Sequence, residues 1–352
     1  MPDLITEARR FRRRILAADS EASARLVRTY AVAFRRIETE LDSLTGRIAT
    51  LRIDGADEDA LRSALYREGR LQRLRALVLA EITDFSQRAA GTITESVRTA
   101  RELGAEGAIG LIDDATPPGI TPTALFDARL PTGAVEAAVG AFRSAAIRGL
   151  LAPLGQAAAQ SVEDAITSGL VRGVNPRSVA REVRDSLGGN LQRALTISRT
   201  EMLRAHREGS IAEYRANQRV LEGWVWVSGL GARTCASCFA QHGSVHPIDE
   251  PMATHPRCRC VAVPKTRPWA DLGVPGMSEP APIRPGAELF RQLDADTQRR
   301  VLGSDAALRA VRGGRVTLHD FVHRDHSGLW GPSSRQAGLR EARENAAARR
   351  AA

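Results

Sequence analysis

The residues best suited to chemistry are the four cysteines, which all lie in one short stretch of the chain. Cys235 and Cys238 form a Cys-x-x-Cys pair, and Cys258 and Cys260 form a Cys-x-Cys pair further along, with His255 just before it. A random distribution over 352 residues would scatter four thiols more widely. This stretch is therefore expected to have a specific chemical or structural role.

Zinc is the metal that this pattern favours. A Cys-x-x-Cys turn directs two thiolates at one centre, and a second pair of cysteines at this separation completes a tetrahedral site. The favoured ligands are Cys235, Cys238, Cys258 and Cys260, because Val261 continues the second pair as a strand. His255 is the alternative ligand, in place of one of the last two. Two disulfides joining the pairs are the alternative to zinc. Either linkage would stabilise a small module with a thin core.

A catalytic zinc would need an open coordination position and a neighbouring base. Asp249 and Glu250 are the nearest acidic residues in sequence, but they lie between Pro247 and Pro251 in a loop. They are expected to be solvated charges. The sequence therefore predicts no catalytic residues, and the chain is not expected to be an enzyme.

A second group of candidate ligands, His319, His323 and His326, lies near the end of the chain. On a helix the first two would share a face at the i, i+4 spacing that binds zinc. No glutamate follows His319, as a metalloprotease motif would require. These histidines are expected to be exposed and unliganded, and their role stays open.

The formal charge of +9 suggests an acidic partner such as nucleic acid. The positive charge is almost entirely arginine, since Lys265 is the single lysine, and basic and acidic residues alternate along residues 35–42. That alternation is typical of a solvated helix face. No apolar run is long enough to cross a bilayer, so no membrane partner is expected and the chain should be made as a soluble protein.

Apolar residues at helical spacing predict a helical region over residues 1–105, arranged as an antiparallel hairpin or bundle. The first stripe is Phe34, Ile37, Leu41, Leu44, Ile48 and Leu51, and the second is Leu61, Leu65, Leu71, Leu74, Val78, Ile82 and Phe85. A polar turn at Asp54-Gly55 separates them, and Asp57 can cap the second helix. The stripes are expected to pack on each other, with a seam shared between subunits as the alternative.

Glycines and prolines predict a linker over residues 106–133, beginning near Gly104. Residues 134–264 are predicted to form a helical plus small β module, in which Pro176 starts a helix, Gly188-Gly189 ends it and Trp224 to Val227 form a strand. Residues 265–352 are predicted to be an extended strap followed by helices, the last from Arg335. The predicted fold class is therefore mainly α, with an α+β module held by the Cys/His cluster.

The chain resembles the Mu F-like head morphogenesis family of tailed bacteriophages over about residues 140–264. The resemblance lies in the order of a few motifs: Asn175-Pro176, Ser198-Arg199-Thr200-Glu201, Tyr214, Trp226, Arg233-Thr234-Cys235-x-x-Cys238 and His255-Pro256-Arg257-Cys258-Arg259-Cys260. The spacing of the histidine and cysteines is the most specific of them.

This resemblance implies a structural minor capsid protein of the virion. It would be made in the host cytoplasm and would act at the portal vertex in procapsid assembly, DNA packaging or ejection. Its partners would be the portal protein and the major capsid protein, with packaged DNA and self-association through the helices as further contacts. A zinc protein that binds packaged DNA is the alternative, and a protease or metal-dependent hydrolase is a third hypothesis.

Overall fold

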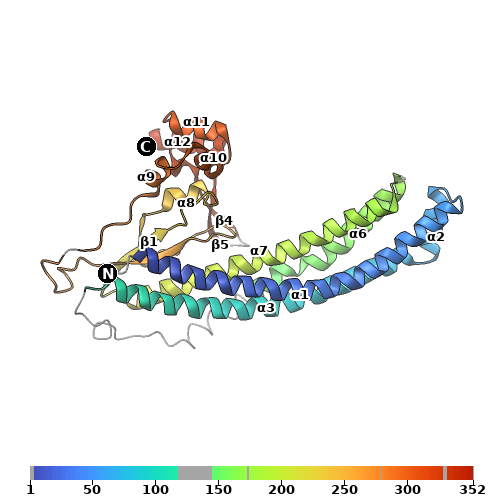
Figure 1. Cartoon of the computed structure of the whole chain (residues 1–352), viewed down its shortest axis with the longest axis horizontal. Coiled ribbons are helices and arrows are strands. Elements are labelled where there is room, and N and C mark those ends of the chain that lie inside the picture. Colours follow the sequence, from blue (N-terminus) through green and yellow to red (C-terminus); the bar gives the residue numbers. More distant parts are fainter. Residues whose placement is uncertain (1–3, 118–144, 173, 278, 328–330, 352) are drawn as a thin grey trace. The chain divides into compact units, whose positions relative to one another are not determined.

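The computed structural model is mainly helical with some β structure, which confirms the predicted fold class (Figure 1). It describes residues 4–117, 145–172, 174–277, 279–327 and 331–351. Within these residues, no helix is both long and apolar enough to cross a membrane.

The chain forms two compact units, each built from separate stretches of sequence. The cysteine unit contains Met1–Ala17, Val97–Glu136 and Thr200–Ala352, and the bundle unit contains Ala18–Ser96 and Ala137–Arg199. Three long helices contribute residues to both units: α1 (Leu4–Ile53), α3 (Arg70–Ala115) and α7 (Pro176–Ala216). The predicted boundaries after residues 133 and 264 stay predictions.

In the bundle unit, α1 packs against α2 (Glu58–Arg67) and α3 as an antiparallel hairpin. Both predicted stripes are largely buried, with Ile37, Leu41 and Leu44 no more than 1% exposed. Arg36 forms an ion pair with Glu81, and Arg47 forms one with Glu68. The residue number of the acidic partner falls as the α1 residue number rises, as antiparallel packing requires. The turn follows the prediction, since Gly55 adopts a positive φ of 86° and the Asp57 side chain accepts a hydrogen bond from the Ala60 amide.

Two further helices of the bundle unit are α6 (Pro153–Val171) and the part of α7 up to Arg199. Tyr30 on α1 donates a hydrogen bond to the Leu187 carbonyl of α7 at 2.5 Å, and Arg184 bonds Glu38 at 3.0 Å. Gly188-Gly189 does not end a helix, so that prediction was wrong: α7 continues through both residues. Each glycine costs about 1 kcal/mol relative to alanine in a helix. Burial of neighbours such as Leu187 and Ala194 offsets this cost.

The predicted start of the linker is also wrong, because α3 continues past Gly104 to Ala115. In the cysteine unit, a Cβ atom on Gly104 would lie 2.0 Å from the His206 carbonyl oxygen of α7, and one on Gly209 would lie 2.4 Å from the Arg101 carbonyl oxygen. These glycines therefore allow the backbones of α3 and α7 to come very close. The Ser210 hydroxyl links the two helices by a 3.0 Å hydrogen bond to the Gly104 carbonyl. Residues 118–133 of the predicted linker lie outside the described residues.

A three-stranded antiparallel sheet carries the cysteine-rich stretch. Its order is β2 (Val245–Pro247), β1 (Leu221–Val227), β3 (Val261–Thr266), so the tryptophan strand is central. Trp224 and Trp226 are at most 1% exposed and belong to one core cluster with Cys238, Cys258 and Cys260. The predicted β1 strand is confirmed, and its two large rings form part of the core beside the thiols.

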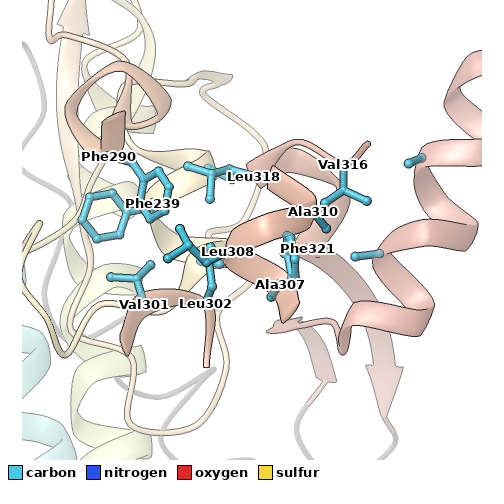
Figure 2. Packing of buried hydrophobic residues seen from close by; sticks show 14 residues of the cluster. Phe239, Phe290, Val301, Leu302, Ala307, Leu308, Ala310, Val316, Leu318 and Phe321 are labelled. Atoms are coloured by element: carbon cyan, nitrogen blue, oxygen red, sulfur yellow. The ribbon is translucent and has the colours of Figure 1, made fainter. Parts of the chain in front are cut away.

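The rest of the cysteine unit is a set of short elements around a second core (Figure 2). They are α8 (Ala236–Gln241), α9 (Gly286–Arg291), α10 (Ala295–Leu302), α11 (Asp305–Arg312), the 3-10 helix η1 (Leu318–Phe321), β4 (Val322–Ser327), β5 (Gly331–Gln336) and α12 (Leu339–Ala351). Phe239 of α8 packs edge-on against Phe290 of α9 at 5.8 Å between ring centroids. Since α8 also carries Cys238, this core fixes the helix on which one thiol is mounted.

The end of the chain differs from the prediction in two ways. His319 and His323 do not share a helix, because η1 ends at Phe321 and His323 lies in β4, opposite Arg335 of β5. The last helix begins at Leu339, not at Arg335, because Arg335 belongs to the β4–β5 hairpin. Burial of Phe321 and the paired backbone of the hairpin favour extended structure over a continuous helix.

Candidate metal centre

Three backbone elements bring the predicted ligands together. Cys235 is the N-cap residue of α8 and Cys238 lies in the first turn of that helix, so both thiols leave the same end of the helix. His255 and Cys258 lie in the loop before β3, and Cys260 directly precedes that strand. The loop is attached to α7, because the Arg257 amide donates to the Thr200 hydroxyl at 3.2 Å.

The five predicted ligands converge in the structure. His255 Nε2 lies 3.3 Å from both Cys235 Sγ and Cys238 Sγ, and Cys238 Sγ lies 3.7 Å from Cys258 Sγ. Two overlapping sets of donor atoms result, Cys235–Cys238–His255 and Cys238–Cys258–Cys260, and within each set the atoms lie within 4.8 Å of one another. The cluster could therefore hold a metal ion, with Cys238 common to both sets.

These three separations are close to the edges of a zinc tetrahedron. With Zn–S bonds of about 2.3 Å and Zn–N bonds of about 2.0 Å, tetrahedral geometry places two sulfurs about 3.8 Å apart and sulfur and nitrogen about 3.5 Å apart. A disulfide would require about 2.05 Å between sulfurs. All four cysteines are free thiols in the structure, including the Cys238–Cys258 pair at 3.7 Å. The donor set therefore fits a bound metal better than it fits two disulfides.

The orientation of the His255 ring also suits a metal ligand. Nδ1 lies 2.8 Å from the Pro256 carbonyl oxygen, which can only accept a hydrogen bond. Nδ1 must therefore carry a proton, and the lone pair of the neutral ring is on Nε2, the atom that faces the two thiols. A backbone carbonyl that fixes the histidine tautomer in this way is a common feature of metal sites.

Close packing of the thiols and the imidazole shifts their pKa values. Hydrogen bonds from Cys238 and His255 lower the pKa of Cys235 to about 5, despite burial. Hydrogen bonds from Cys238 and Cys260 bring the pKa of Cys258 well below its usual value. Burial alone would lower the pKa of His255, but hydrogen bonds to Cys235 and Cys258 raise it to about 11. A proton shared by His255 Nε2 and the neighbouring thiolates thus competes with a metal cation for the lone pairs of these nitrogen and sulfur atoms.

A buried residue that sequence reasoning missed, Arg207, contacts this cluster. Its Nε donates to the Cys260 carbonyl at 2.9 Å, Nη1 donates to the Thr254 hydroxyl at 3.0 Å, and Nη2 donates to the Cys258 carbonyl. The side chain is at a core position of α7, four residues after Leu203 and seven before Tyr214, both of which are buried. An arginine within an apolar stripe was the signal that could have identified it.

The other polar residues of the module are not part of the cluster. Asp249 is 88% exposed beside Arg215, and Glu250 pairs with His246 at 3.1 Å. His246 stacks on Trp224 at 4.2 Å between ring centroids. His242 is buried and its Nδ1 accepts a hydrogen bond from the Ser228 amide. The acidic residues nearest in sequence therefore have partners of their own.

The terminal histidines lie elsewhere in the cysteine unit. His319 is exposed on η1, and His323 Nδ1 lies 2.5 Å from a Glu341 carboxylate oxygen. Both line a cavity of about 450 Å³ together with His246 and Arg324. Neither belongs to a group of three metal-binding side chains within the part of the chain that the structure describes. The side chain of His326 lies outside the described residues.

Comparison with known proteins gives one match. No curated protein and no solved structure is significantly similar to the chain. Residues 160–263 match the family described as Phage Mu protein F like protein. The matched region runs from α6 to β3 and includes all five predicted ligands. Over these residues the chain is similar to the Mu F-like phage proteins, which confirms the resemblance inferred from its histidine and cysteine motifs.

Proposed function

We propose that the chain is a structural head morphogenesis protein of a tailed phage, and that a zinc ion bound by the Cys/His cluster stabilises its Mu F-like segment. The family match over residues 160–263 supports the head morphogenesis role. The zinc site is supported by the convergence of thiols and a correctly oriented imidazole, with three donor separations close to those of a zinc tetrahedron. Zinc would supply a rigid link between α8 and the strand β3, which the short elements around it could not provide alone.

The proposed ligands are Cys235, Cys238, His255 and Cys258. His255 Nε2 faces the Cys235 and Cys238 thiols, and Cys258 Sγ lies 3.7 Å from Cys238 Sγ. Cys260 is the alternative to His255, since its thiol also lies within 4.8 Å of Cys238 and Cys258. A site with four protein ligands has no open position, which is typical of structural zinc. The proposed role is accordingly structural, without catalysis.

Metal analysis tests the zinc proposal directly. The purified chain should contain one zinc per chain with or without reductant, and a chelator should lower its thermal stability. Cys258→Ala should lose most of the zinc, whereas Cys260→Ala is the matched control and should keep it. Loss of zinc from Cys260→Ala together with retention by His255→Ala would select the four-cysteine set instead. A zinc-free chain with no reactive thiols before reduction would support disulfides.

The proposed location is the portal vertex of the procapsid, with the portal protein and the major capsid protein as partners. This proposal is supported by the family match over residues 160–263. Procapsids made with a tagged chain should contain it together with portal protein. Deleting the portal gene should remove the chain from particles, whereas its retention on portal-free shells would indicate a partner elsewhere in the shell.

Contact with packaged DNA is less well supported, because arginines of the bundle unit have acidic partners on neighbouring helices. Arg36, Arg47 and Arg184 each bond a carboxylate across the bundle. Binding that releases many counterions weakens steeply as salt rises. We therefore expect no DNA binding at moderate salt, and a tight complex with a steep salt dependence would favour the DNA-binding alternative.

A further inference from the structure

We propose that Arg207 is a positioning residue of the metal centre, which holds the Cys258–Cys260 segment in place and balances the negative charge of the metal-bound thiolates. The inference rests on the zinc site proposed above and concerns a residue outside its ligand set. Arg207 is only 4% exposed, so its contacts with the ligand loop are made away from water.

The guanidinium fixes the backbone of the ligand loop at three points. Two of its nitrogens donate to the carbonyls of Cys258 and Cys260, and the third donates to the Thr254 hydroxyl. A planar guanidinium has rigidly placed donors, so these bonds restrict the loop on both sides of Arg259. The Cys258 thiol is thereby held at the separation from Cys238 that a tetrahedral site needs. A lysine ammonium has no such planar fork.

The positive charge of the Arg207 guanidinium also bears on the metal centre. Arginine stays ionised when buried, so its charge requires compensation nearby. Among the described residues, no carboxylate lies within ion-pair distance of Arg207, and the three groups that accept its hydrogen bonds are neutral. Zn²⁺ with three thiolates and one neutral imidazole carries a charge of −1. Together with the guanidinium, the buried metal site would be neutral. Loss of the metal would change the charge of the Cys/His cluster and remove this balance.

Arg215 offers a matched control on the same helix. It also donates to backbone carbonyls of the cysteine module, those of Ile248 and Asp249, but its side chain is 48% exposed and it lies beside the Asp249 carboxylate. Arg215 therefore shares the helix, the residue type and the bonding to loop carbonyls with Arg207. It lacks the burial and the contact with residues that carry ligands.

The experiment compares the wild-type chain with Arg207→Met, Arg207→Lys and Arg215→Met. Zinc affinity is measured by competition with a chromophoric chelator, and the ligand field by the absorption spectrum of the Co²⁺-substituted protein. Thermal stability is recorded with zinc bound and after chelation. Arg207→Met should weaken zinc binding by about 10–100-fold, as loss of an outer contact typically does, and should change the Co²⁺ spectrum. Arg207→Lys should show a smaller loss, and Arg215→Met none.

The outcomes separate this inference from the proposal on which it rests. A wild-type chain that binds no zinc would overturn both. If the wild type binds zinc and Arg207→Met binds it equally tightly, while both its zinc-bound and chelated forms lose the same thermal stability, Arg207 serves only to pack the core and the inference fails alone. If Arg207→Met does not fold, Arg207→Lys decides: wild-type affinity with an unchanged Co²⁺ spectrum would overturn the inference.

Discussion

His206 should make the stability of the chain sensitive to mild acid. Burial, and after it the charges of Arg207 and Arg14, lower the pKa of His206 to about 4 from its usual 6.5. Among the residues that the structure describes, its Nε2 has no hydrogen-bond partner. In the folded chain the His206 ring therefore stays neutral down to about pH 4, whereas in the unfolded chain it takes up a proton near pH 6.5. We expect the stabilising contribution to be complete above pH 6.5 and to be lost as the pH falls toward 4.

The size of the effect follows from the two pKa values. The interval between 6.5 and about 4 corresponds to about 3 kcal/mol of unfolding free energy, at about 1.4 kcal/mol per pH unit. His206→Leu removes the titrating ring and leaves an apolar side chain at this buried position. The wild type should therefore lose about 3 kcal/mol more than this variant between pH 7 and pH 4.

Urea unfolding of both proteins at several pH values provides the measurement. The chains are chelated first, so that acid release of metal does not contribute, and the remaining thiols titrate equally in both. His319→Leu is the control, because it removes an exposed histidine in place of a buried one. Parallel profiles for the wild type and His206→Leu would refute the reasoning, since they would mean that His206 is protonated equally in the folded and unfolded chains.

Three further changes should act through other parts of the fold. Phe321→Ala removes a ring that is 1% exposed in the second core (Figure 2) and should cost about 3–5 kcal/mol in urea unfolding, whereas Tyr66→Ala, at a site 72% exposed, should cost less than about 0.5 kcal/mol. Gly104→Ala should lower the melting temperature because its Cβ meets a backbone oxygen, whereas Gly91→Ala on the same helix has open space and should raise it. Burial alone would raise the pKa of Asp320, but hydrogen bonds from Arg349 and Thr317 outweigh it and lower that pKa. Asp320→Asn should therefore lower the melting temperature at pH 7, and its difference from the wild type should shrink as the pH falls below 3.8.

The parts of the fold that local chemistry determines were predictable from the sequence. The heptad seam of α1 needs only its apolar spacing, and the caps at Asp57 and Ser304 need only a side-chain oxygen before the first turn. Convergence of Cys235 and Cys238 likewise follows from one helix turn. These features depend on residues close in sequence, so their patterns are visible without the fold.

The features that were missed depend on contacts between distant residues. Gly104 would normally weaken a helix, and only its approach to His206 reveals that its small size is needed for packing. The β4–β5 hairpin has little apolar alternation, and its strands are defined by pairing with each other. Arg207 is one of many arginines, and its role depends on carbonyls some fifty residues later in the chain. The separations of the His255 and Cys260 donor atoms from Cys238 likewise depend on the fold.

The discontinuous sequence of the cysteine unit has a consequence for synthesis on the ribosome. Ala8, near the start of α1, packs in one cluster with Val227, Val261 and Val263 of the sheet. Translation adds about 5–20 residues per second, so the first helix waits on the order of tens of seconds before these strands emerge. The bundle unit, by contrast, ends at Arg199 and has all its residues much earlier. The nascent chain should therefore fold from the middle outward, with its first residues among the last to find their partners.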